Sequence, residues 1–412
     1  MFGWEFPPFQ AGGLATATVG LVKGLLRNGV GVTLVVPFPV DRSPLPELRL
    51  LGAPPEGAEE LRVHRIPSPL LPYGGAGLYT EVLARARPSP GVRQVYGPDL
   101  FAEVGRFTEL ARRIAATEPH DVIDAHDWIA FGAGLAARAA SGRPLLTHIH
   151  ATEFDRTGGP GNPEIARRER EGLTLADRII SNSQRLKDQC VERYGIRTDR
   201  VDVVHWGVDG ERSDRGPLPP APFPAGTPVV LFLGRVTQQK GPDYFMEMAG
   251  RVARYVPRVK FVLAGNGDML PGLMQRAAEL GIADRVIFAG GLHGADVDRA
   301  YRMATVCVMP SRSEPFGLVA LESLQQGTPI IMPRQAGAAE VVRHAFKVDY
   351  WDIDEMTNKV VAILRHDTLR QELAEGGRRE LELPRFGLDE PARRTAESYA
   401  RALHQAREDS AA

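Results

Sequence analysis

Short apolar segments alternate with helical segments along almost the whole chain, and the alternation restarts after one stretch rich in proline and glycine. Before that stretch, strands are expected at 30–37, 120–127, 142–153, 178–183 and 201–207, and a helix at 14–28. After it, strands are expected at 228–234, 260–265, 286–290, 306–311 and 329–333, and helices at 242–256, 271–280, 296–304, 317–326, 338–344 and 387–408. Such alternation is typical of parallel sheets that helices cover on both faces. The sequence therefore predicts an α/β fold with doubly wound parallel sheets.

The length of the chain indicates more than one domain. It has 412 residues, whereas about 150 residues per domain is typical. We expect a first domain at 1–212, a Pro-rich linker at 213–227, a second domain at 228–385 and a C-terminal helix at 386–412.

The composition excludes several classes of protein. Lys and Arg number 50 against 51 Asp and Glu, and this balance gives no indication of a nucleic-acid partner. No apolar run approaches the roughly 18 residues of a membrane-spanning helix, and no signal peptide is apparent. Cys190 and Cys307, the only cysteines, are expected to be buried thiols rather than a disulfide. These features predict a cytoplasmic protein without integral membrane association.

Polar residues follow several expected strands, where ligands of doubly wound folds bind. They are His126, Asp127, His148, His150, Glu153, Arg235 and Glu314. His148 and His150 are two positions apart on one expected strand, so we expect them to point to opposite faces. We place His150, at the strand end, in the site, and His148 in the core. No spacing typical of metal ligands is convincing, so no metal is expected.

The stretch SRSEPFGLVALES at 311–323 predicts a helix that begins near Gly317, with Glu314 before it and Glu322 within it. The first amides of a helix have no intrahelical partner and attract anions, and a phosphate fits there well. Beside a bound phosphate, Glu314 is suited to accept hydrogen bonds from a polyol, and Glu322 from a ribose. The alternative is that both glutamates are ordinary solvated residues.

Two further glycine-containing turns fit a phosphate ligand. In FLGRVTQQKG at 232–241, Gly234 ends a strand, and Arg235 and Lys240 are placed to stabilise a departing diphosphate. In PFQAGGLATAT at 8–18, the pair Gly12-Gly13 opens a helix, which suits phosphate or close substrate contact. Taken singly, the cations are equally well read as exposed basic residues, and Gly-Gly as a plain turn.

Together, these residues resemble the family-4 retaining glycosyltransferases, close to bacterial and archaeal glycogen synthases. The family signature of two glutamates separated by seven residues matches Glu314 and Glu322. Other matching segments are GGL at 12–14, AHDW at 125–128, HATEFDRTGG at 150–159, GRVTQQKG at 234–241, EPFGLVALES at 314–323 and QAGAAEVV at 335–342. The resemblance covers almost the whole chain.

The resemblance implies a GT-B fold. Two Rossmann-like domains then face each other across a cleft, and the C-terminal helix crosses back to the first domain. It also implies a nucleotide diphosphate sugar as co-substrate, and neither a metal nor a further cofactor. The catalytic residues it implies are His150, Arg235, Lys240 and Glu314. The donor-binding residues it implies are Gly12, Gly13, Gly234, Leu292 (near the base), Phe316, Gly317, Leu318, Val319 and Glu322 (on the ribose).

The function expected from the resemblance is retaining transfer of a hexose, glucose in the first instance, from ADP- or UDP-glucose to an α-1,4-glucan. The main alternative is another sugar transferred to a small-molecule or lipid-linked acceptor. A sugar-nucleotide isomerase and a non-catalytic relative are less favoured, because the two glutamates and both cations are all present. Three features depart from the family: Gln10-Ala11 lacks the synthase lysine, Trp206 replaces a common asparagine, and Met1 begins inside the expected first strand.

Overall fold

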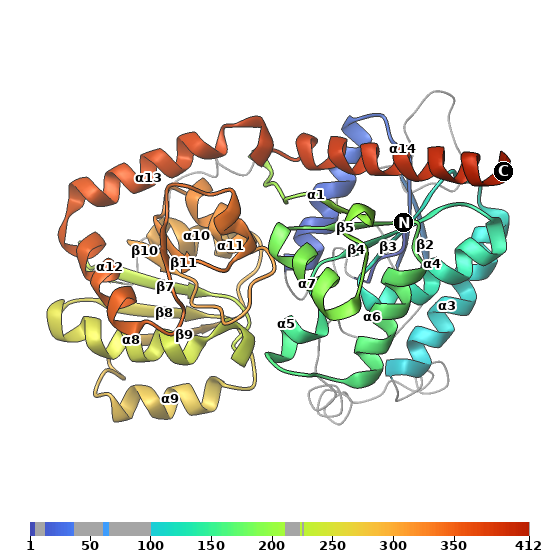
Figure 1. The fold of residues 1–412 in the computed structure, drawn as a ribbon. Helices are drawn as coiled ribbons and strands as arrows, with labels where there is room; N and C mark the ends of the chain where they lie inside the picture. The colour runs from blue at the N-terminus through green and yellow to red at the C-terminus, as the bar shows by residue number, and fades with distance from the viewer. Residues whose placement is uncertain (5–12, 37–60, 66–99, 211–222, 225, 412) are drawn as a thin grey trace.

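The structure is a computed structural model. It describes residues 1–4, 13–36, 61–65, 100–210, 223–224 and 226–411. Gly12 and most of the linker expected at 213–227 lie outside the described residues. Figure 1 shows two α/β halves side by side, with the first and last parts of the chain on the same half.

The N-terminal half is built on parallel strands. They are β1 (Val32–Val36), β2 (Leu61–Arg65), β3 (Ile123–His126), β4 (Leu145–Ile149), β5 (Arg178–Ser181) and β6 (Val201–Val203). β1 pairs with β2, and β3 to β6 pair in sequence order. Phe2 bridges both groups, since it pairs with Val35 on one side and Ala125 on the other. The helices are α1 (Gly13–Arg27), α3 (Leu100–Thr117), α4 (Trp128–Ser141), α5 (Glu153–Thr157), α6 (Pro163–Leu175) and α7 (Gln184–Tyr194).

The C-terminal half contains a six-stranded parallel sheet in the order β12-β11-β10-β7-β8-β9. Its strands are β7 (Val229–Leu233), β8 (Lys260–Ala264), β9 (Val286–Gly290), β10 (Val306–Val308), β11 (Ile330–Pro333) and β12 (Phe346–Val348). Its helices are α8 (Pro242–Tyr255), α9 (Leu270–Glu279), α10 (Ala295–Met303), α11 (Leu318–Gln325), α12 (Ile353–Arg365) and α13 (Asp367–Leu381). The strand order reverses between β7 and β10, and ligands of such sheets bind at this switch point.

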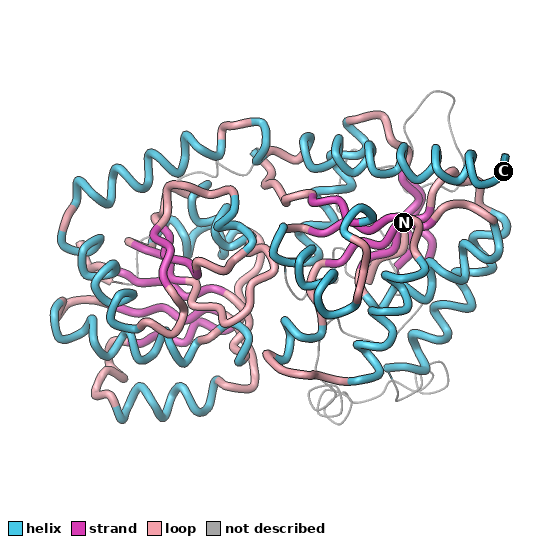
Figure 2. The backbone as a smooth tube through the Cα atoms, viewed as in Figure 1, coloured by secondary structure: helices cyan, strands magenta, loops and turns pink. Residues whose placement is uncertain are grey.

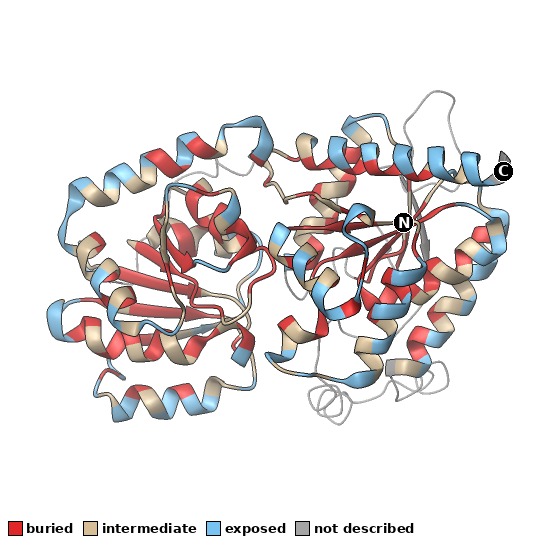
Figure 3. Ribbon diagram, viewed as in Figure 1, coloured by how far each residue is buried: buried red, intermediate tan, exposed pale blue. Residues whose placement is uncertain are grey.

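Both sheets are buried between helices (Figures 2 and 3). All five residues of β4 are buried, as are the first four of β7. A strand covered on both faces needs apolar side chains on both, which explains why these strands read as continuous apolar runs in the sequence. The expected α/β fold with two Rossmann-like domains is confirmed.

The last helix, α14 (Asp389–Ala411), packs on the N-terminal half. Its residues Ala392, Tyr399 and Ala402 belong to the hydrophobic core of that half. The contact with α1 is close at Gly24, because a Cβ there would lie 2.4 Å from the carbonyl oxygen of Leu388. The C-terminal helix therefore crosses back to the first domain, as the resemblance implied.

The sequence prediction was wrong at 338–344, where a helix was expected. Only a 3-10 turn, η5 (Gly337–Glu340), forms there. Its first amides bond outside the turn: Gly337 N–H donates to the carbonyl of Glu314, and Ala338 N–H to that of Phe316. The segment is thus held by the loop after β10 and does not continue as a helix.

The prediction also omitted β2, α3, α4, α5 and α6 in the first half and α12, α13 and β12 in the second. The spacing of Met356, Val360 and Ile363, all buried on one side of α12, is a helical signal that was present in the sequence. Cys190 and Cys307 are free and buried, which confirms that part of the analysis. Among the described residues, no helix combines the length and the apolar character that crossing a membrane requires.

The packing of α14 on α1 can be tested at Gly24. We expect Gly24→Ala to lower the free energy of unfolding by about 1–3 kcal/mol, because the added methyl would meet the Leu388 carbonyl and Ala392. Gly105 in α3 is a matched control, since a Cβ there meets nothing within 4 Å. Gly105→Ala should be neutral or stabilising by up to about 1 kcal/mol, since alanine favours helix. Denaturant unfolding of both variants measures this, and equal effects would contradict the packing.

Candidate active site

The loops that follow β7 and β10 meet at the switch point of the second sheet. Lys240, at the end of the loop after β7, donates a hydrogen bond from Nζ to Glu314 Oε2, 2.7 Å away. Ser311 Oγ donates to the same carboxylate oxygen at 3.0 Å. Glu314 is buried, with 7% of its surface exposed. The structure thus joins two residues that the sequence analysis had assigned to catalysis from separate motifs.

Helix α11 begins immediately after this pair, at the glycine that the sequence predicted. Gly317 has φ 106° and ψ 68°, and no side chain caps the helix there. This backbone conformation favours glycine, and a Cβ at Gly317 would also lie only 3.0 Å from Cγ of Glu314. The first amides of α11, at Leu318 and Val319, therefore begin next to Lys240 and Glu314, as an anion site needs.

The first domain brings a second helix start to the same place. α1 begins at Gly13, and a Cβ on Gly13 would lie 3.9 Å from Cδ1 of Leu318. The first residues of α1 and α11 are therefore close together across the two domains. Helix N-termini carry partial positive charge, so their convergence favours a ligand with negative charge. Gly12, the other glycine of this turn, lies outside the described residues.

The remaining donor-binding candidates line the same edge of the second sheet. Arg235 follows Gly234 and donates from Nη2 to Gln239 Oε1 at 2.9 Å. Glu322, on the second turn of α11, accepts from the hydroxyl of Tyr301 at 3.1 Å. Leu292 lies in the loop after β9, at the far end of the strand order. These positions are spread along the carboxyl edge of the sheet, as an extended ligand would require.

The two domains are tied together directly beside Glu314 by residues that the sequence analysis missed. Arg185, on α7, donates from Nη2 to Asp155 Oδ1 at 2.9 Å and to Ser313 Oγ at 2.8 Å. Ser313 Oγ in turn donates to Asp155 Oδ1 at 2.6 Å. Ser183 Oγ donates to the carbonyl of Pro315 at 2.6 Å. The loop that carries Glu314 is thus held by the first domain on both sides of that residue.

A second tie comes from Glu340, in the turn η5. Its carboxylate accepts hydrogen bonds from the backbone N–H groups of Gln184 and Arg185, both at 2.9 Å. These amides are the first of helix α7, so a carboxylate from the second domain caps a helix of the first. His205 lies 2.7 Å from the same carboxylate through Nε2. The contact fixes the relative position of the two domains.

The two histidines of the fourth strand do not point to opposite faces, and that expectation was wrong. Strand β4 ends at Ile149, so His150 lies beyond it and the alternation of strand side chains no longer applies. The rings of His148 and His150 are stacked, with centroids 5.6 Å apart and planes at 8°. His126 stacks on His148 and reaches His150, with 2.9 Å between His126 Nδ1 and His150 Nε2. All three rings are buried.

Trp206 joins the histidines to the glutamate loop. Its ring centroid lies 5.3 Å from that of His150 and 5.5 Å from that of Phe316. Trp206 belongs to the first domain's last described segment, and Phe316 lies between Glu314 and Gly317. The departure noted at Trp206 is therefore a packing contact between the domains, and it brings His150 near the loop of Glu314.

Asp124, His126 and His148 each offer a ligand atom within 4.8 Å of the others, which is close enough for a metal ion. His126 Nε2 lies 3.5 Å and His148 Nδ1 lies 3.1 Å from the same oxygen, Oδ2 of Asp124. Hydrogen bonds and ion pairs to the Asp124 carboxylate account for the cluster without an ion.

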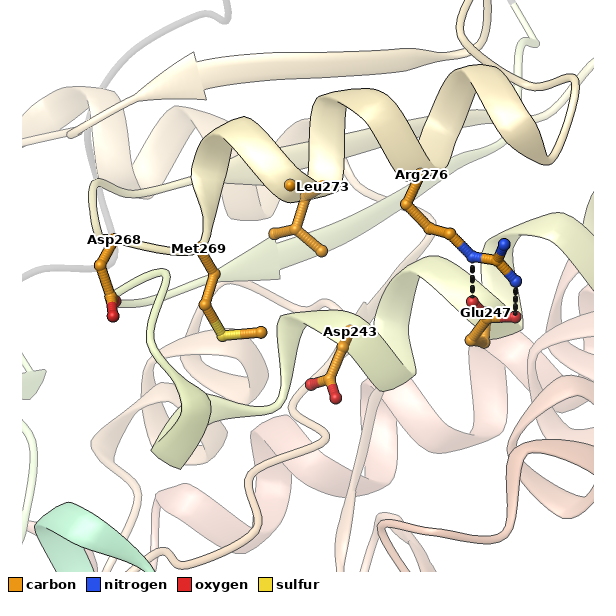
Figure 4. A pocket seen from close by; sticks show the side chains of 7 residues that line it. Asp243, Glu247, Asp268, Met269, Leu273 and Arg276 are labelled. Atoms are coloured by element: carbon orange, nitrogen blue, oxygen red, sulfur yellow. Dashed lines mark hydrogen bonds and ion pairs between the residues drawn. The ribbon is translucent and has the colours of Figure 1, made fainter.

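A cavity of about 380 Å³ lies between α8 and α9 (Figure 4). It is lined by Asp243, Glu247, Asp268, Met269, Gly272, Leu273 and Arg276. Its charged groups include an ion pair, since Arg276 donates to both carboxylate oxygens of Glu247. None of its lining residues is a candidate from the sequence analysis.

Comparison with known proteins finds glycosyltransferase families over both halves of the chain. Residues 11–212 match the family model described as Glycosyltransferase Family 4, and residues 219–380 match Glycosyl transferases group 1. The chain is 30% identical over 371 residues to a D-inositol 3-phosphate glycosyltransferase of Mycobacterium sp., covering 76% of this chain and 84% of that one. It is 28% identical to an uncharacterized glycosyltransferase of Methanocaldococcus jannaschii, covering 84% and 82%.

Solved structures agree in fold. Sucrose-phosphate synthase from Thermosynechococcus elongatus superposes with a TM-score of 0.73 at 21% identity, covering 96% of this chain and 94% of that one. Anabaena HepE in complex with UDP and glucose superposes with a TM-score of 0.68 at 16% identity, covering 97% and 98%. With both halves matched by the family models and a relative at 30% identity over most of its length, this chain belongs to the family-4 glycosyltransferases of GT-B fold.

Proposed function

We propose that this glycosyltransferase moves glucose from UDP-glucose or ADP-glucose to an acceptor hydroxyl with retention of configuration. The observation that carries the proposal is the Lys240–Glu314 pair beside the uncapped start of α11. The pair places a cation and a buried carboxylate next to a helix N-terminus. A diphosphate fits the cation and the helix, and the hydroxyls of a hexose fit the carboxylate. HepE, of the same fold, is described with UDP and glucose bound.

The proposed step is a displacement on one face of the sugar. The bond between the anomeric carbon and the diphosphate oxygen breaks, and the acceptor oxygen forms its bond to that carbon on the same side. The acceptor proton passes to the departing diphosphate. Negative charge grows on the diphosphate as it leaves, so Lys240, Arg235 and the amides of α11 stabilise the transition state more than the bound donor. Glu314 binds sugar hydroxyls and is not the nucleophile.

For the acceptor, an uncharged α-1,4-glucan is the first candidate. Two arginines of the first domain lie near the loop of His150, and both have carboxylate partners. Arg156 Nη1 lies 2.7 Å from Glu169 Oε1, and Arg185 Nη2 lies 2.9 Å from Asp155 Oδ1. The proposal of a glucan rests on residues 150–159, HATEFDRTGG, which resemble those of glycogen synthases.

A phosphorylated polyol is the second candidate, and the relatives favour it. Several curated relatives at 30–34% identity are described as D-inositol 3-phosphate glycosyltransferases. A sugar-nucleotide isomerase is not favoured, because Glu314 and Glu322 keep the spacing of the glycosyltransferase signature.

The role of the two cations is testable by substitution. We expect Lys240→Ala and Arg235→Ala each to lower kcat by about 10²–10³-fold, because each removes charge that stabilises the departing diphosphate. Lys260→Ala is a matched control, since Lys260 begins β8 at the opposite edge of the sheet and bonds the Asp284 carbonyl. Steady-state kinetics on the best donor measures the effect. A Lys240 variant with the turnover of the Lys260 control would remove Lys240 from the mechanism.

A matrix of donors and acceptors tests the substrates. UDP-glucose, ADP-glucose, GDP-mannose and UDP-N-acetylglucosamine are each offered with maltooligosaccharides, with D-inositol 3-phosphate, or with no acceptor. We expect nucleoside diphosphate release from a glucose donor that depends on the glucan, and an α-configured product by NMR. Dependence on inositol phosphate would select the second acceptor, and a β-configured product would contradict retention.

A further inference from the structure

We propose that Gln239 is a positioning residue that orients Arg235 for its contact with the departing diphosphate. The inference rests on the proposed function, in which Arg235 stabilises that group. Gln239 lies in the 3-10 turn η4 (Gln238–Lys240), after β7 and directly before the second cation of the site, Lys240. Only 7% of its surface is exposed, so its side-chain amide needs hydrogen-bond partners within the protein.

The side chain of Gln239 bridges the two loops that form the site. Its Oε1 accepts a hydrogen bond from Arg235 Nη2 at 2.9 Å, and its Nε2 donates to the carbonyl oxygen of Ser313 at 3.3 Å. A guanidinium can only donate and a carbonyl oxygen can only accept, so a single orientation of the amide fits both partners. One side chain thus links Arg235, in the loop after β7, to the residue before Glu314, in the loop after β10.

The main chain of Gln239 is anchored to the same loop. Its carbonyl oxygen accepts hydrogen bonds from the backbone N–H groups of Arg312, at 2.9 Å, and of Ser313, at 3.5 Å. The two loops also meet at Gly241, since a Cβ there would lie 2.1 Å from the carbonyl oxygen of Pro310. These contacts involve main-chain atoms, so we expect them to persist when the Gln239 side chain is replaced. The amide can therefore be removed while the loops stay together.

An amide holds a cation without cancelling its charge. Gln239 is neutral, whereas Lys240 is paired with the carboxylate of Glu314. A guanidinium carries five N–H donors in one plane, so a bond to one of them orients the whole group. Charge that is already oriented stabilises a transition state more than charge that must reorient during the reaction. Gln239 therefore contributes to the reaction through Arg235.

Gln239→Met tests the role of the amide, because methionine keeps an unbranched side chain of similar length and removes both hydrogen bonds. Gln238→Met is the matched control, since Gln238 is the preceding residue of the same turn and is exposed. We expect Gln239→Met to lower kcat by about 10-fold with a smaller change in the donor KM, and Gln238→Met to leave both unchanged. Steady-state kinetics with a glucose donor measures this.

A double-mutant cycle separates positioning of Arg235 from a general structural role. If Gln239 acts through Arg235, Gln239→Met should change kcat by less than about 2-fold in protein that already carries Arg235→Ala. A substitution that only loosened the turn would lower kcat by the same factor in both backgrounds. Equal factors would therefore overturn the proposal, as would native kcat in Gln239→Met.

A crystal structure of Gln239→Met gives a readout that does not depend on turnover. We expect the Arg235 guanidinium to leave its native position, while the turn η4 and the Lys240–Glu314 hydrogen bond remain. An unmoved guanidinium would overturn the proposal, whatever the kinetics show. A native protein that transfers no sugar would instead contradict the proposed function, and this structure would still decide whether Gln239 orients Arg235.

The native protein crystallised with UDP provides a test that needs no variant, should Gln239→Met fail to fold. We expect Arg235 to keep its hydrogen bond to Gln239 while another of its N–H groups reaches a phosphate oxygen. An Arg235 side chain that leaves Gln239 to bind the phosphate would overturn the proposal. So would an Arg235 side chain that stays on Gln239 and contacts no phosphate.

Discussion

The hydrogen bond between Lys240 and Glu314 depends on the reversal of strand order in the second sheet, and the rest of the site is arranged around it. Only where β7 and β10 are neighbours can the loops after them converge at one point. Helix α11 begins at that point because Gly317 turns the chain with a backbone conformation that other residues rarely adopt. Topology thus brings together the cation and the carboxylate, and one glycine brings the helix start to them.

The second domain does not complete this site alone. The start of α1 lies close to that of α11, Arg185 and Ser183 hold the loop on either side of Glu314, and Glu340 caps α7 from the opposite domain. The helix α14 adds a longer connection, since it leaves the second domain and packs in the core of the first. Movement of one domain relative to the other would therefore change both the charge around the diphosphate and the position of His150.

The sequence predicted what depends on local pattern. Continuous apolar runs located the strands of both sheets except β2 and β12, and the glycine at 317 located the start of α11. Contacts between residues distant in sequence had no such signal: Arg185 and Ser313 are 128 positions apart, and no pattern in either segment indicates the other. The error at His150 had a different source, because side-chain alternation was extended one residue past the end of β4. Where a helix was expected at 338–344, the chain forms only the short turn η5 before it enters β12 at Phe346.

The central claim is that a donor diphosphate lies between Lys240 and the first amides of α11. A crystal structure of the protein with UDP-glucose or ADP-glucose tests it most directly. The account predicts phosphate oxygens within hydrogen-bond distance of the amides of Leu318 and Val319 and of Lys240 Nζ, with the hexose hydroxyls on Glu314. A diphosphate bound away from the start of α11, with the Lys240–Glu314 pair unchanged and no sugar contact to Glu314, would contradict it.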